Sequence, residues 1–329
     1  MPTWQRLLVF LSSYPEEWFS GTKLASKLSL TRSAVWKNMK VIADKGYTVE
    51  SHHGLGYRLI MDDQLNESLI QNMLTVNKNL TINVFDQVSS TNTIAKQLLT
   101  TDLKEATVVI ANQQTAGYGR QNRSFYSPAK SGIYMSIALP LIDKEKIAAG
   151  LLTTGTAVAV GLAIKKVFHR QVKYKWVNDI ILDNRKCGGI LTEAVTDLES
   201  GRIASIVVGI GLNLTLDQSK MPSELINKAG PIAKRSKSKR NILIAEILNQ
   251  FFLMYKSYRT GAFLKDYRKH SLVLDKTVTV VVNHKQLVGH AERINSQGGL
   301  ILKTTDGQLL TITSGEITKL NLLEGNYHE

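Results

Sequence analysis

The sequence contains a single cysteine, Cys187, and this scarcity excludes two kinds of protein. One cysteine cannot form an internal disulfide, and it cannot build a metal site that needs several cysteine ligands. Such a chain suits a reducing compartment, so we expect a cytoplasmic protein.

Long apolar runs are also lacking. The apolar stretch within residues 1–18 is too short for a signal peptide, and no small-residue cleavage site follows it. The longest uncharged run, residues 148–164, contains several threonines and glycines and falls short of a membrane span. We expect this run to form a buried helix, and we expect no membrane partner.

Several enzyme signatures are missing. The chain has no Gly-x-x-x-x-Gly-Lys-Ser/Thr phosphate loop, no His-Glu-x-x-His zinc motif and no Gly-x-Ser-x-Gly nucleophile elbow. It also shows no repeat of 20–50 residues. The chemistry must therefore be carried by other residues.

Positive charge is what the chain has in excess. Its 329 residues carry a formal net charge of +14, and the length fits two or three domains. The excess is concentrated in residues 1–60, with eight basic and four acidic residues, and in residues 220–270, with twelve and three. This imbalance favours an anionic partner, although it also fits solubility alone.

Residues 1–62 are predicted to form a winged helix-turn-helix DNA-binding domain. Ser20 and Thr31 are placed to cap two helices, and residues 47–60 alternate as a two-stranded hairpin does. A small helical packing domain is the alternative interpretation. If the domain binds DNA, the helix that begins at Thr31 enters the major groove. The residues expected to contact DNA are Thr22, Thr31, Arg32, Ser33, Trp36, Lys37, Asn38 and Lys40.

The rest of the chain divides into three predicted segments. Residues 63–79 are expected to be a linker with a short helix. Residues 80–270 alternate strands and helices and predict a domain built on a mixed sheet, with an amphipathic helix at 241–258. Residues 271–329 contain short strands separated by turns, which predicts a small β-barrel or sandwich. The fold class is therefore α+β and multidomain.

The stretch "QQTAGYGRQNRSFYSP", Gln113 to Pro128, combines glycines, arginines and aromatic rings. Flexible backbone with fixed positive charge suits a loop that closes over an anionic ligand. Taken alone, a surface turn with solvated arginines is the simpler interpretation.

Four further blocks give this loop a context. They are "SSTN" at Ser89–Asn92, "KWVND" at Lys175–Asp179, "KCGGILTE" at Lys186–Glu193 and "GIGLN" at Gly209–Asn213. Each block is weak alone, but their order and separations are distinctive together. With this combination the sequence resembles the biotin–protein ligases, specifically the bifunctional ligase and biotin-operon repressor type, over nearly the whole chain.

The resemblance implies a central domain similar to class II synthetases and an SH3-like C-terminal β-barrel. Members of the family make biotinyl-5′-AMP from biotin and ATP with Mg²⁺, and then transfer biotin to a lysine of a carrier protein. The implied partners are the biotin carboxyl carrier domain of acetyl-CoA carboxylase or other biotin-dependent carboxylases, and operator DNA. The resemblance also implies a homodimer in the adenylate-bound state, with biotinyl-5′-AMP as bound intermediate and corepressor.

The resemblance also assigns site residues, and their chemistry agrees with it. A buried ureido ring needs neutral hydrogen-bonding groups, while a carboxylate beside an α-phosphate needs fixed cations. Catalytic roles fall to Arg120, Lys175 and Asp179, with Asp179 left open between holding Mg²⁺, orienting the acceptor amine and capping a strand turn. No metal site of the protein's own is predicted. The residues expected to bind biotin or nucleotide are Ser90, Thr91, Asn92, Gln114, Gly117, Tyr118, Gly119, Arg120, Lys175, Asn178, Lys186, Gly188, Gly189 and Asn213.

The chain departs from the family pattern at four positions. The family usually has arginine, glycine, tryptophan and proline where this sequence has Tyr118, Asn122, Phe125 and Val177. Asparagine tolerates a positive φ better than most residues, and phenylalanine keeps a ring. We expect activity to survive these changes.

Two other functions stay open. A lipoate- or octanoate-transferring relative would share the central fold, but the terminal domains argue against it. A biotin-sensing repressor with weak or lost ligase activity would keep the neutral residues.

The basic stretch at residues 234–240 is expected to be a solvated loop, with a DNA contact as the alternative.

Overall fold

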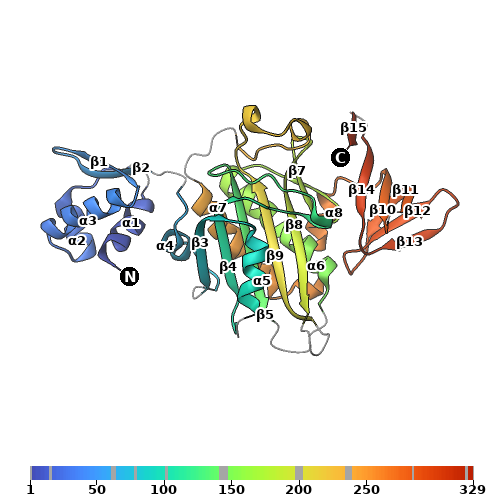
Figure 1. Ribbon diagram of the computed structural model, residues 1–329, viewed down its shortest axis with the longest axis horizontal. Helices are drawn as coiled ribbons and strands as arrows, with labels where there is room; N and C mark the ends of the chain where they lie inside the picture. The colour runs from blue at the N-terminus through green and yellow to red at the C-terminus, as the bar shows by residue number, and fades with distance from the viewer. Residues whose placement is uncertain are drawn as a thin grey trace.

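The computed structural model describes residues 2–14, 17–60, 64–77, 80–100, 103–140, 147–196, 203–233, 239–283, 285–322 and 325–328. Three units follow one another along the long axis of the molecule (Figure 1). The helical N-terminal unit and the C-terminal sheet lie at opposite ends, with the central domain between them. Most of the basic stretch, residues 234–238, lies outside the described residues.

The N-terminal unit has the predicted order of three helices and a hairpin. Its elements are α1 (Thr3–Ser12), α2 (Gly21–Leu28), α3 (Arg32–Asp44), β1 (Thr48–His52) and β2 (Gly56–Ile60). Ser20 accepts a hydrogen bond from the Lys23 amide at 3.1 Å, and Thr31 accepts one from the Ala34 amide at 3.1 Å. These are the two predicted helix caps. Leucines of α1 and the apolar face of α3 form a core of this unit's own.

A seven-stranded sheet forms the centre of the molecule. Its strands run in the order β3-β4-β5-β9-β8-β7-β6. Their bounds are β3 (Thr81–Val88), β4 (Thr107–Gln114), β5 (Gly132–Pro140), β6 (Lys173–Lys175), β7 (Asp179–Leu182), β8 (Arg185–Thr196) and β9 (Ile203–Asn213). The β3–β4 pair is parallel and the other pairs are antiparallel, so the sheet is mixed, as the sequence predicts.

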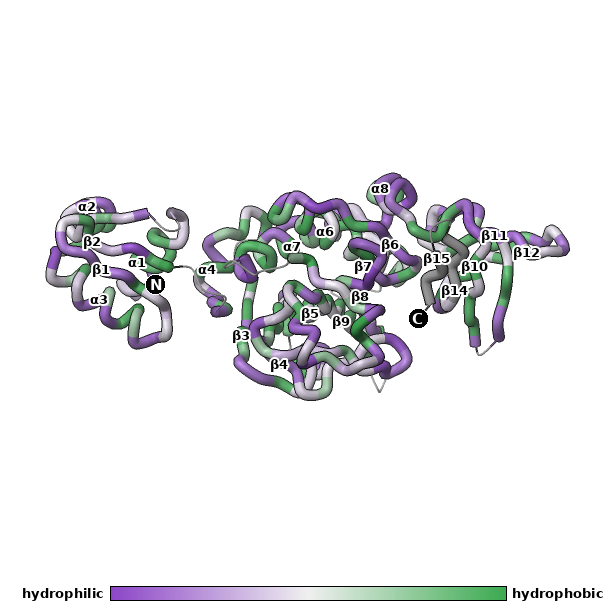
Figure 2. Tube along the Cα trace, turned by 90° about the horizontal axis from the view of Figure 1, so that it is seen from above, coloured by the Kyte–Doolittle hydropathy of each residue, from purple (hydrophilic) through white to green (hydrophobic). Residues whose placement is uncertain are grey.

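Helices cover both faces of this sheet. Helix α5 (Thr91–Leu99) lies on one face (Figure 1), while α6 (Ala149–Phe168) and α7 (Arg240–Tyr255) lie together on the other (Figure 2). Alternation along β4 serves both layers, because Val108 joins the core that contains α6 and Val109 packs with Ala95 of α5. The sheet is therefore packed between two layers of helices.

Helix α6 corrects one expectation about length. It has 20 residues and is apolar enough to cross a membrane by length and composition, although the sequence run falls short of a span. However, 72% of its apolar window is buried inside the protein, as expected of a core helix. Its small residues allow close packing, since a Cβ at Gly161 would lie 2.2 Å from the Tyr174 hydroxyl.

Helix α7 is not amphipathic, and that prediction was wrong. Arg240, Asn241 and Asn249 are buried, whereas Leu253 is 56% exposed. Most of the polar atoms of these buried side chains are paired with other segments. Arg240, for example, donates to the Gly132 carbonyl at 3.0 Å and to Asn112 Oδ1 at 2.9 Å. Arg240 is therefore a structural cation and not part of a solvated loop.

The connector between the first two units is packed. It contains the short helix α4 (Glu67–Asn72), whose Leu69 belongs to the N-terminal core and whose Ile70 belongs to the central core. Asn241 accepts from the Asn66 amide at 2.9 Å and donates to the Gln64 carbonyl at 2.8 Å. Asn249 likewise accepts from the Thr75 amide and donates to the Met73 carbonyl.

The C-terminal unit is an antiparallel sheet of short strands, as predicted. Its order is β13-β12-β11-β10-β14-β15. The strands are β10 (Thr277–Val282), β11 (Lys285–Ile294), β12 (Leu300–Thr304), β13 (Leu309–Ile312), β14 (Glu316–Leu322) and β15 (Gly325–His328), preceded by helix α8 (Leu264–Lys269). Trp176 donates to the Gly298 carbonyl at 3.0 Å, and Arg268 donates to the Ile294 carbonyl at 2.9 Å. These bonds fasten the C-terminal unit beside the β6–β7 turn.

Candidate functional site

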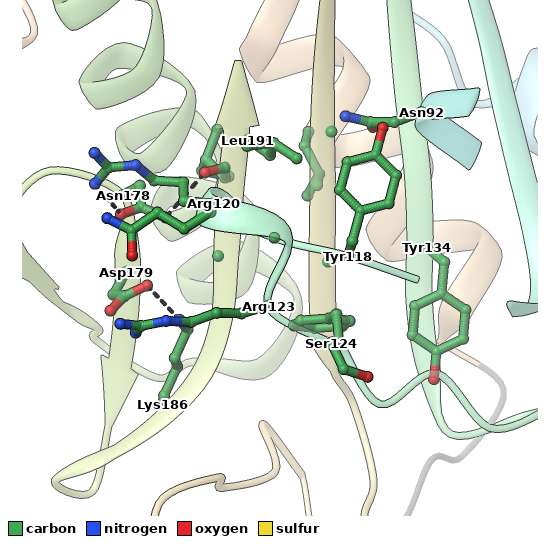
Figure 3. Close-up of a pocket in the computed structure, with 18 of the residues that line it drawn as sticks. Asn92, Tyr118, Arg120, Arg123, Ser124, Tyr134, Asn178, Asp179, Lys186 and Leu191 are labelled. Atoms are coloured by element: carbon green, nitrogen blue, oxygen red, sulfur yellow. Dashed lines mark hydrogen bonds and ion pairs between the residues drawn. The ribbon is translucent and has the colours of Figure 1, made fainter. Parts of the chain in front are cut away.

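A cleft of about 920 Å³, counting the open space at its mouth, lies over the middle strands of the central sheet. The N-terminus of α5, the loop 117–125, the β6–β7 turn and strands β8 and β9 supply most of its wall. Glu316 and Ile317 of the C-terminal unit complete it. Figure 3 shows labelled side chains of the loop, the β6–β7 turn and the strands around one space.

One end of the cleft is built from neutral polar groups. Gln114 Oε1 accepts from the Thr91 amide at 2.8 Å and from the Thr91 hydroxyl at 3.1 Å. The Ser136 hydroxyl lies 2.7 Å from Thr91 Oγ1 and 2.5 Å from Asn92 Oδ1. Burial raises the pKa of Tyr134 to about 12, so this ring also stays neutral. Such groups orient a ligand by hydrogen bonds without imposing charge.

The loop over the cleft is shaped by local backbone geometry. Gln121 and Asn122 have φ of 56° and 58°, so the asparagine expected to tolerate this conformation adopts it. A Cβ at Gly117 would lie 2.6 Å from Gln114 Nε2 and 2.8 Å from Ser127 Oγ, so only glycine fits there. The loop closes on itself through a hydrogen bond of 2.8 Å from the Gly119 amide to the Arg123 carbonyl.

Two arginines of the loop reach the opposite wall. Arg120 donates to Asn178 Oδ1 at 3.3 Å and to the Gly315 carbonyl at 2.7 Å. Arg123 pairs with both carboxylate oxygens of Glu316, one of them at 2.6 Å. The loop is therefore held by the β13–β14 turn of the C-terminal unit.

A lysine–aspartate–lysine group forms the cationic end of the cleft. The Asp179 carboxylate is 2.6 Å from Lys186 Nζ and 3.9 Å from Lys175 Nζ. Lys175 is only 1% exposed and Asp179 only 6%. One buried carboxylate between two cations leaves a net positive charge facing the cleft, which suits an anion.

This arrangement does not fit a metal held by Asp179. Its carboxylate already faces two lysines, which would repel a divalent cation. In the described part of the chain, no group of three or more His, Cys, Asp or Glu side chains could hold a metal ion. The contacts of Asp179 indicate a role that the sequence did not suggest, which is to position Lys175 and Lys186.

A second cavity adjoins the first. Apolar side chains such as Met221 and Leu225 line it together with polar ones such as Lys228, and it shares Phe125 and Lys186 with the cleft. The ring of Phe125 lies against β9, where a Cβ at Gly211 would approach it to 2.8 Å. A largely apolar cavity next to a cationic cleft suits a flat ring that carries phosphate.

The structure brings most of the expected ligand-binding residues to the cleft. These are Ser90, Thr91, Asn92, Gln114, Tyr118, Gly119, Arg120, Lys175, Asn178, Lys186 and Gly189, together with Asp179. Asn213 lines the second cavity instead. Gly117 and Gly188 do not line either one. A Cβ at Gly188 would lie 2.7 Å from the Gly211 carbonyl oxygen, so this glycine serves strand packing.

Sequence reasoning missed three residues that shape the site. Ser136 sits in the middle of β5, Glu193 in β8, and Glu316 almost 200 residues from the loop it holds. The first two lie in ordinary strand patterns, and no local pattern links Glu316 to Arg123. Only the tertiary fold reveals these contacts.

The expected DNA-contacting residues lie at the exposed part of α3 and near the start of α2. Asn38 is half-buried and donates to the Ala34 carbonyl at 2.8 Å. Trp36 is 53% exposed, and Lys40 Nζ lies 4.2 Å from the centre of its ring. The others, all exposed, are Thr22, Thr31, Arg32, Ser33 and Lys37.

The fold and the cleft define a protein ligase of the class that handles biotin and lipoate. Residues 84–213 match the Biotin/lipoate A/B protein ligase family, residues 3–58 match an HTH domain, and residues 273–320 match the Biotin protein ligase C terminal domain. The fold is similar to that of the biotin protein ligase from Aquifex aeolicus in complex with biotin and ATP. That likeness has a TM-score of 0.58 at 22% identity and covers 76% of this chain and 99% of that chain.

Curated relatives narrow this class. The chain is 33% identical to the bifunctional ligase/repressor BirA of Bacillus spizizenii in an alignment of 309 residues that covers 92% of this chain and 94% of the relative. It is 32% identical to the protein of the same name from Bacillus subtilis over the same shares. The chain belongs to this family of bifunctional ligase/repressors.

Proposed function

We propose that this protein is a biotin–protein ligase that also represses transcription in response to biotin. The ligase activity is supported mainly by one observation. A single cleft has neutral hydrogen-bonding groups at one end and a lysine–aspartate–lysine group at the other. Biotin has the matching polarity, since its ureido ring is neutral and its tail ends in a carboxylate.

The chemistry follows from that polarity. A carboxylate oxygen of biotin attacks the α-phosphorus of ATP, the bond to the β-phosphate oxygen breaks, and diphosphate leaves. The acceptor lysine amine then attacks the carbonyl carbon of biotinyl-5′-AMP, forms an amide, loses a proton and releases AMP. Negative charge gathers at the α-phosphate in both steps, and Arg120, Lys175 and Lys186 are the fixed cations beside it.

The adjoining apolar cavity is the proposed place for the adenine ring. Phe125 offers a ring face between the two cavities, and Asn213 offers an amide for polar contacts. Phe125 thus retains the aromatic character that tryptophan has in the family. Mg²⁺, which neutralises ATP phosphates when bound, would arrive on those phosphates and not on a protein carboxylate.

The repressor part rests on the first unit. The exposed face of α3 presents Trp36, Lys37 and Lys40 in the geometry of a recognition helix. Biotinyl-5′-AMP is the proposed corepressor, operator DNA and the biotin carboxyl carrier domain are the proposed partners, and the adenylate-bound form is a homodimer in the cytoplasm. The lysine–aspartate–lysine group supports retained catalysis over a protein that only senses biotin.

A single assay tests the ligase proposal. Purified protein is incubated with biotin, ATP, Mg²⁺ and a biotin carboxyl carrier domain, and the mass of the carrier and the release of AMP are followed. We expect one biotin on the carrier's lysine only when ATP is present. Tight biotin binding with no transfer would instead establish the sensing repressor. A parallel reaction replaces biotin and its carrier by lipoate and a lipoyl domain, and transfer in that reaction alone would establish the other relative.

A further inference from the structure

Four polar side chains meet beside the neutral end of the cleft. Glu193 of β8 receives Lys96 Nζ of α5 at 2.6 Å on one carboxylate oxygen. Its other oxygen receives Asn92 Nδ2 at 2.6 Å and the Tyr118 hydroxyl at 3.1 Å. Figure 3 shows Tyr118 extending from the loop toward Asn92. Neither Glu193 nor Lys96 lines the cleft itself.

The chemistry of Glu193 decides how the Asn92 amide is turned. A carboxylate only accepts hydrogen bonds, so it must face the nitrogen of the amide and not its oxygen. The Asn92 oxygen then points the other way, toward Ser136 Oγ at 2.5 Å and toward Gly209 in the cleft wall. An amide oxygen has two lone pairs, so this one can accept a further hydrogen bond from a ligand.

We propose that Glu193 is a positioning residue that sets the selectivity of the neutral end of the cleft. By holding the nitrogen of Asn92, it presents the Asn92 oxygen to the ligand, and the site then favours a ligand that donates an N–H there. A ureido ring is such a ligand, so this inference rests on the proposed function and deepens it.

Lys96 and Tyr118 maintain this arrangement. Burial lowers the pKa of Lys96, but its hydrogen bonds to Glu193 and Tyr118 and its attraction to Glu193 outweigh burial and raise it. Lys96 is therefore charged throughout the neutral range and keeps Glu193 paired. The Tyr118 hydroxyl joins the loop to the same carboxylate, in a position where the family usually has arginine. The tyrosine departure is thus accommodated by a hydrogen bond.

Calorimetric titration of the full chain with biotin, without ATP, tests the role of Glu193. Glutamine has the same shape but also donates hydrogen bonds, so it lets the Asn92 amide turn over. We expect Glu193→Gln to raise the Kd for biotin at least about tenfold, the cost of misplacing one hydrogen bond to a ligand. The Kd for ATP should change by less than about twofold, because the cationic end is untouched.

The matched control is Glu246→Gln. Glu246 is also paired with a lysine, with Lys166 Nζ at 2.8 Å, but it lies on α7 and outside the cleft. This variant should bind biotin as the wild type does. Melting curves recorded for both variants separate a loss of fold from a loss of affinity.

A double-mutant cycle identifies the route of the effect. If Glu193 acts through Asn92, adding Glu193→Gln to Asn92→Ala should weaken binding by less than about twofold further, whereas independent effects would multiply. Multiplying effects, or wild-type affinity in Glu193→Gln, would overturn the inference alone. Absence of biotin binding by the wild type would overturn the proposed function and this inference with it.

Discussion

Lys175 and Lys173 lie two positions apart on β6 and face different surroundings. Lys175 is buried in the cleft wall next to Asp179, while Lys173 is exposed. We expect Lys175→Met and Arg120→Ala each to lower kcat/KM for adenylate formation about 10²–10³-fold, since each removes a fixed charge where charge develops in the transition state. Diphosphate release measures this rate.

Lys173→Ala is the control for that experiment. It removes a lysine from the same strand without touching the cleft, so its rate should match the wild type. Undiminished rates in both Lys175→Met and Arg120→Ala would remove the catalytic assignment of these residues.

The sequence predicted site residues correctly where charged or polar side chains stand at an unusual position. A lysine followed by tryptophan, asparagine and aspartate at a strand end stands out, and Lys175 and Asp179 do line the cleft. Ser136 and Glu193 could not be found this way, because a serine or glutamate inside a strand pattern has many other uses. Their partners come from α5, and the sequence does not encode that proximity in any local spacing.

At the scale of elements, the β13–β14 turn belongs functionally to the cleft although it lies in another unit. Glu316 holds Arg123 with two hydrogen bonds, and the neighbouring Gly315 carbonyl holds Arg120. We expect Glu316→Gln to release the loop and to speed dissociation of biotinyl-5′-AMP about tenfold, by weakening one charge-assisted pair. Dissociation of the radiolabelled adenylate on dilution measures it.

Glu292 supplies the control for this turn. It lies in the same sheet with Arg293 and Lys303 nearby, at 3.5 Å and 3.9 Å, and outside the cleft. Glu292→Gln should retain the adenylate as the wild type does. Equal retention by Glu316→Gln would show that the loop closes without the C-terminal sheet.

Helix α4 gives a second prediction at this scale, because it belongs to two cores. Deleting residues 1–62 should abolish DNA binding but leave α4 anchored to Asn241 and Asn249, with much of the ligase activity retained. Deleting residues 1–76 also removes Ile70 and Leu74 from the central core. Burial of each such side chain contributes about 1.5–3 kcal/mol, so the shorter protein should unfold at clearly lower urea concentration.

Urea unfolding of the two truncated proteins, followed by circular dichroism, checks this difference. The point substitution Leu69→Ala in the full chain is the control, since it disturbs the N-terminal core and leaves Ile70 in place. Equal midpoints for the two truncations would mean that α4 is a passive linker.

Helices and strands could be predicted from the sequence where they depend on interactions between neighbouring residues. Strand alternation, helix periodicity and the caps at Ser20 and Thr31 all depend on neighbours within a few residues, and the structure confirms them. Helix α7 was misjudged because its polar residues bond to segments more than 100 residues away. Hydrophobic periodicity cannot distinguish a solvated asparagine from one that anchors a distant backbone.

At the scale of the whole molecule, the central domain contacts both the N-terminal and the C-terminal unit. The N-terminal unit meets it through α4 and α7, and the C-terminal unit meets it at Trp176 and at the loop arginines. The ligand cleft lies between the central and C-terminal units, and the DNA-facing helix α3 lies at the far end (Figure 1). A ligand in the cleft therefore does not touch the DNA-binding surface, and any control of DNA binding has to act at a distance or through assembly.

This separation of cleft and DNA-binding surface favours control of DNA binding through dimerisation. One winged helix contacts one half-site, whereas a symmetric dimer engages two half-sites and gains from a high effective concentration. Biotinyl-5′-AMP would hold loop 117–125 more firmly than its contacts with Gly315 and Glu316 alone, which lowers the entropy cost when two central domains pair. We expect a mostly monomeric protein without ligand, and a dimer that binds an inverted repeat tightly once biotin and ATP are added.

Sedimentation velocity and gel-shift assays at one fixed salt concentration test this switch, using a DNA site selected from random duplexes. Lys37→Ala combined with Lys40→Ala should weaken DNA binding and leave ligand-dependent dimerisation unchanged, because both lysines lie on the exposed face of α3. That variant separates the DNA contact from assembly. Equal affinity for the selected site with and without biotinyl-5′-AMP would reject the switch, even in a protein whose ligase activity is intact.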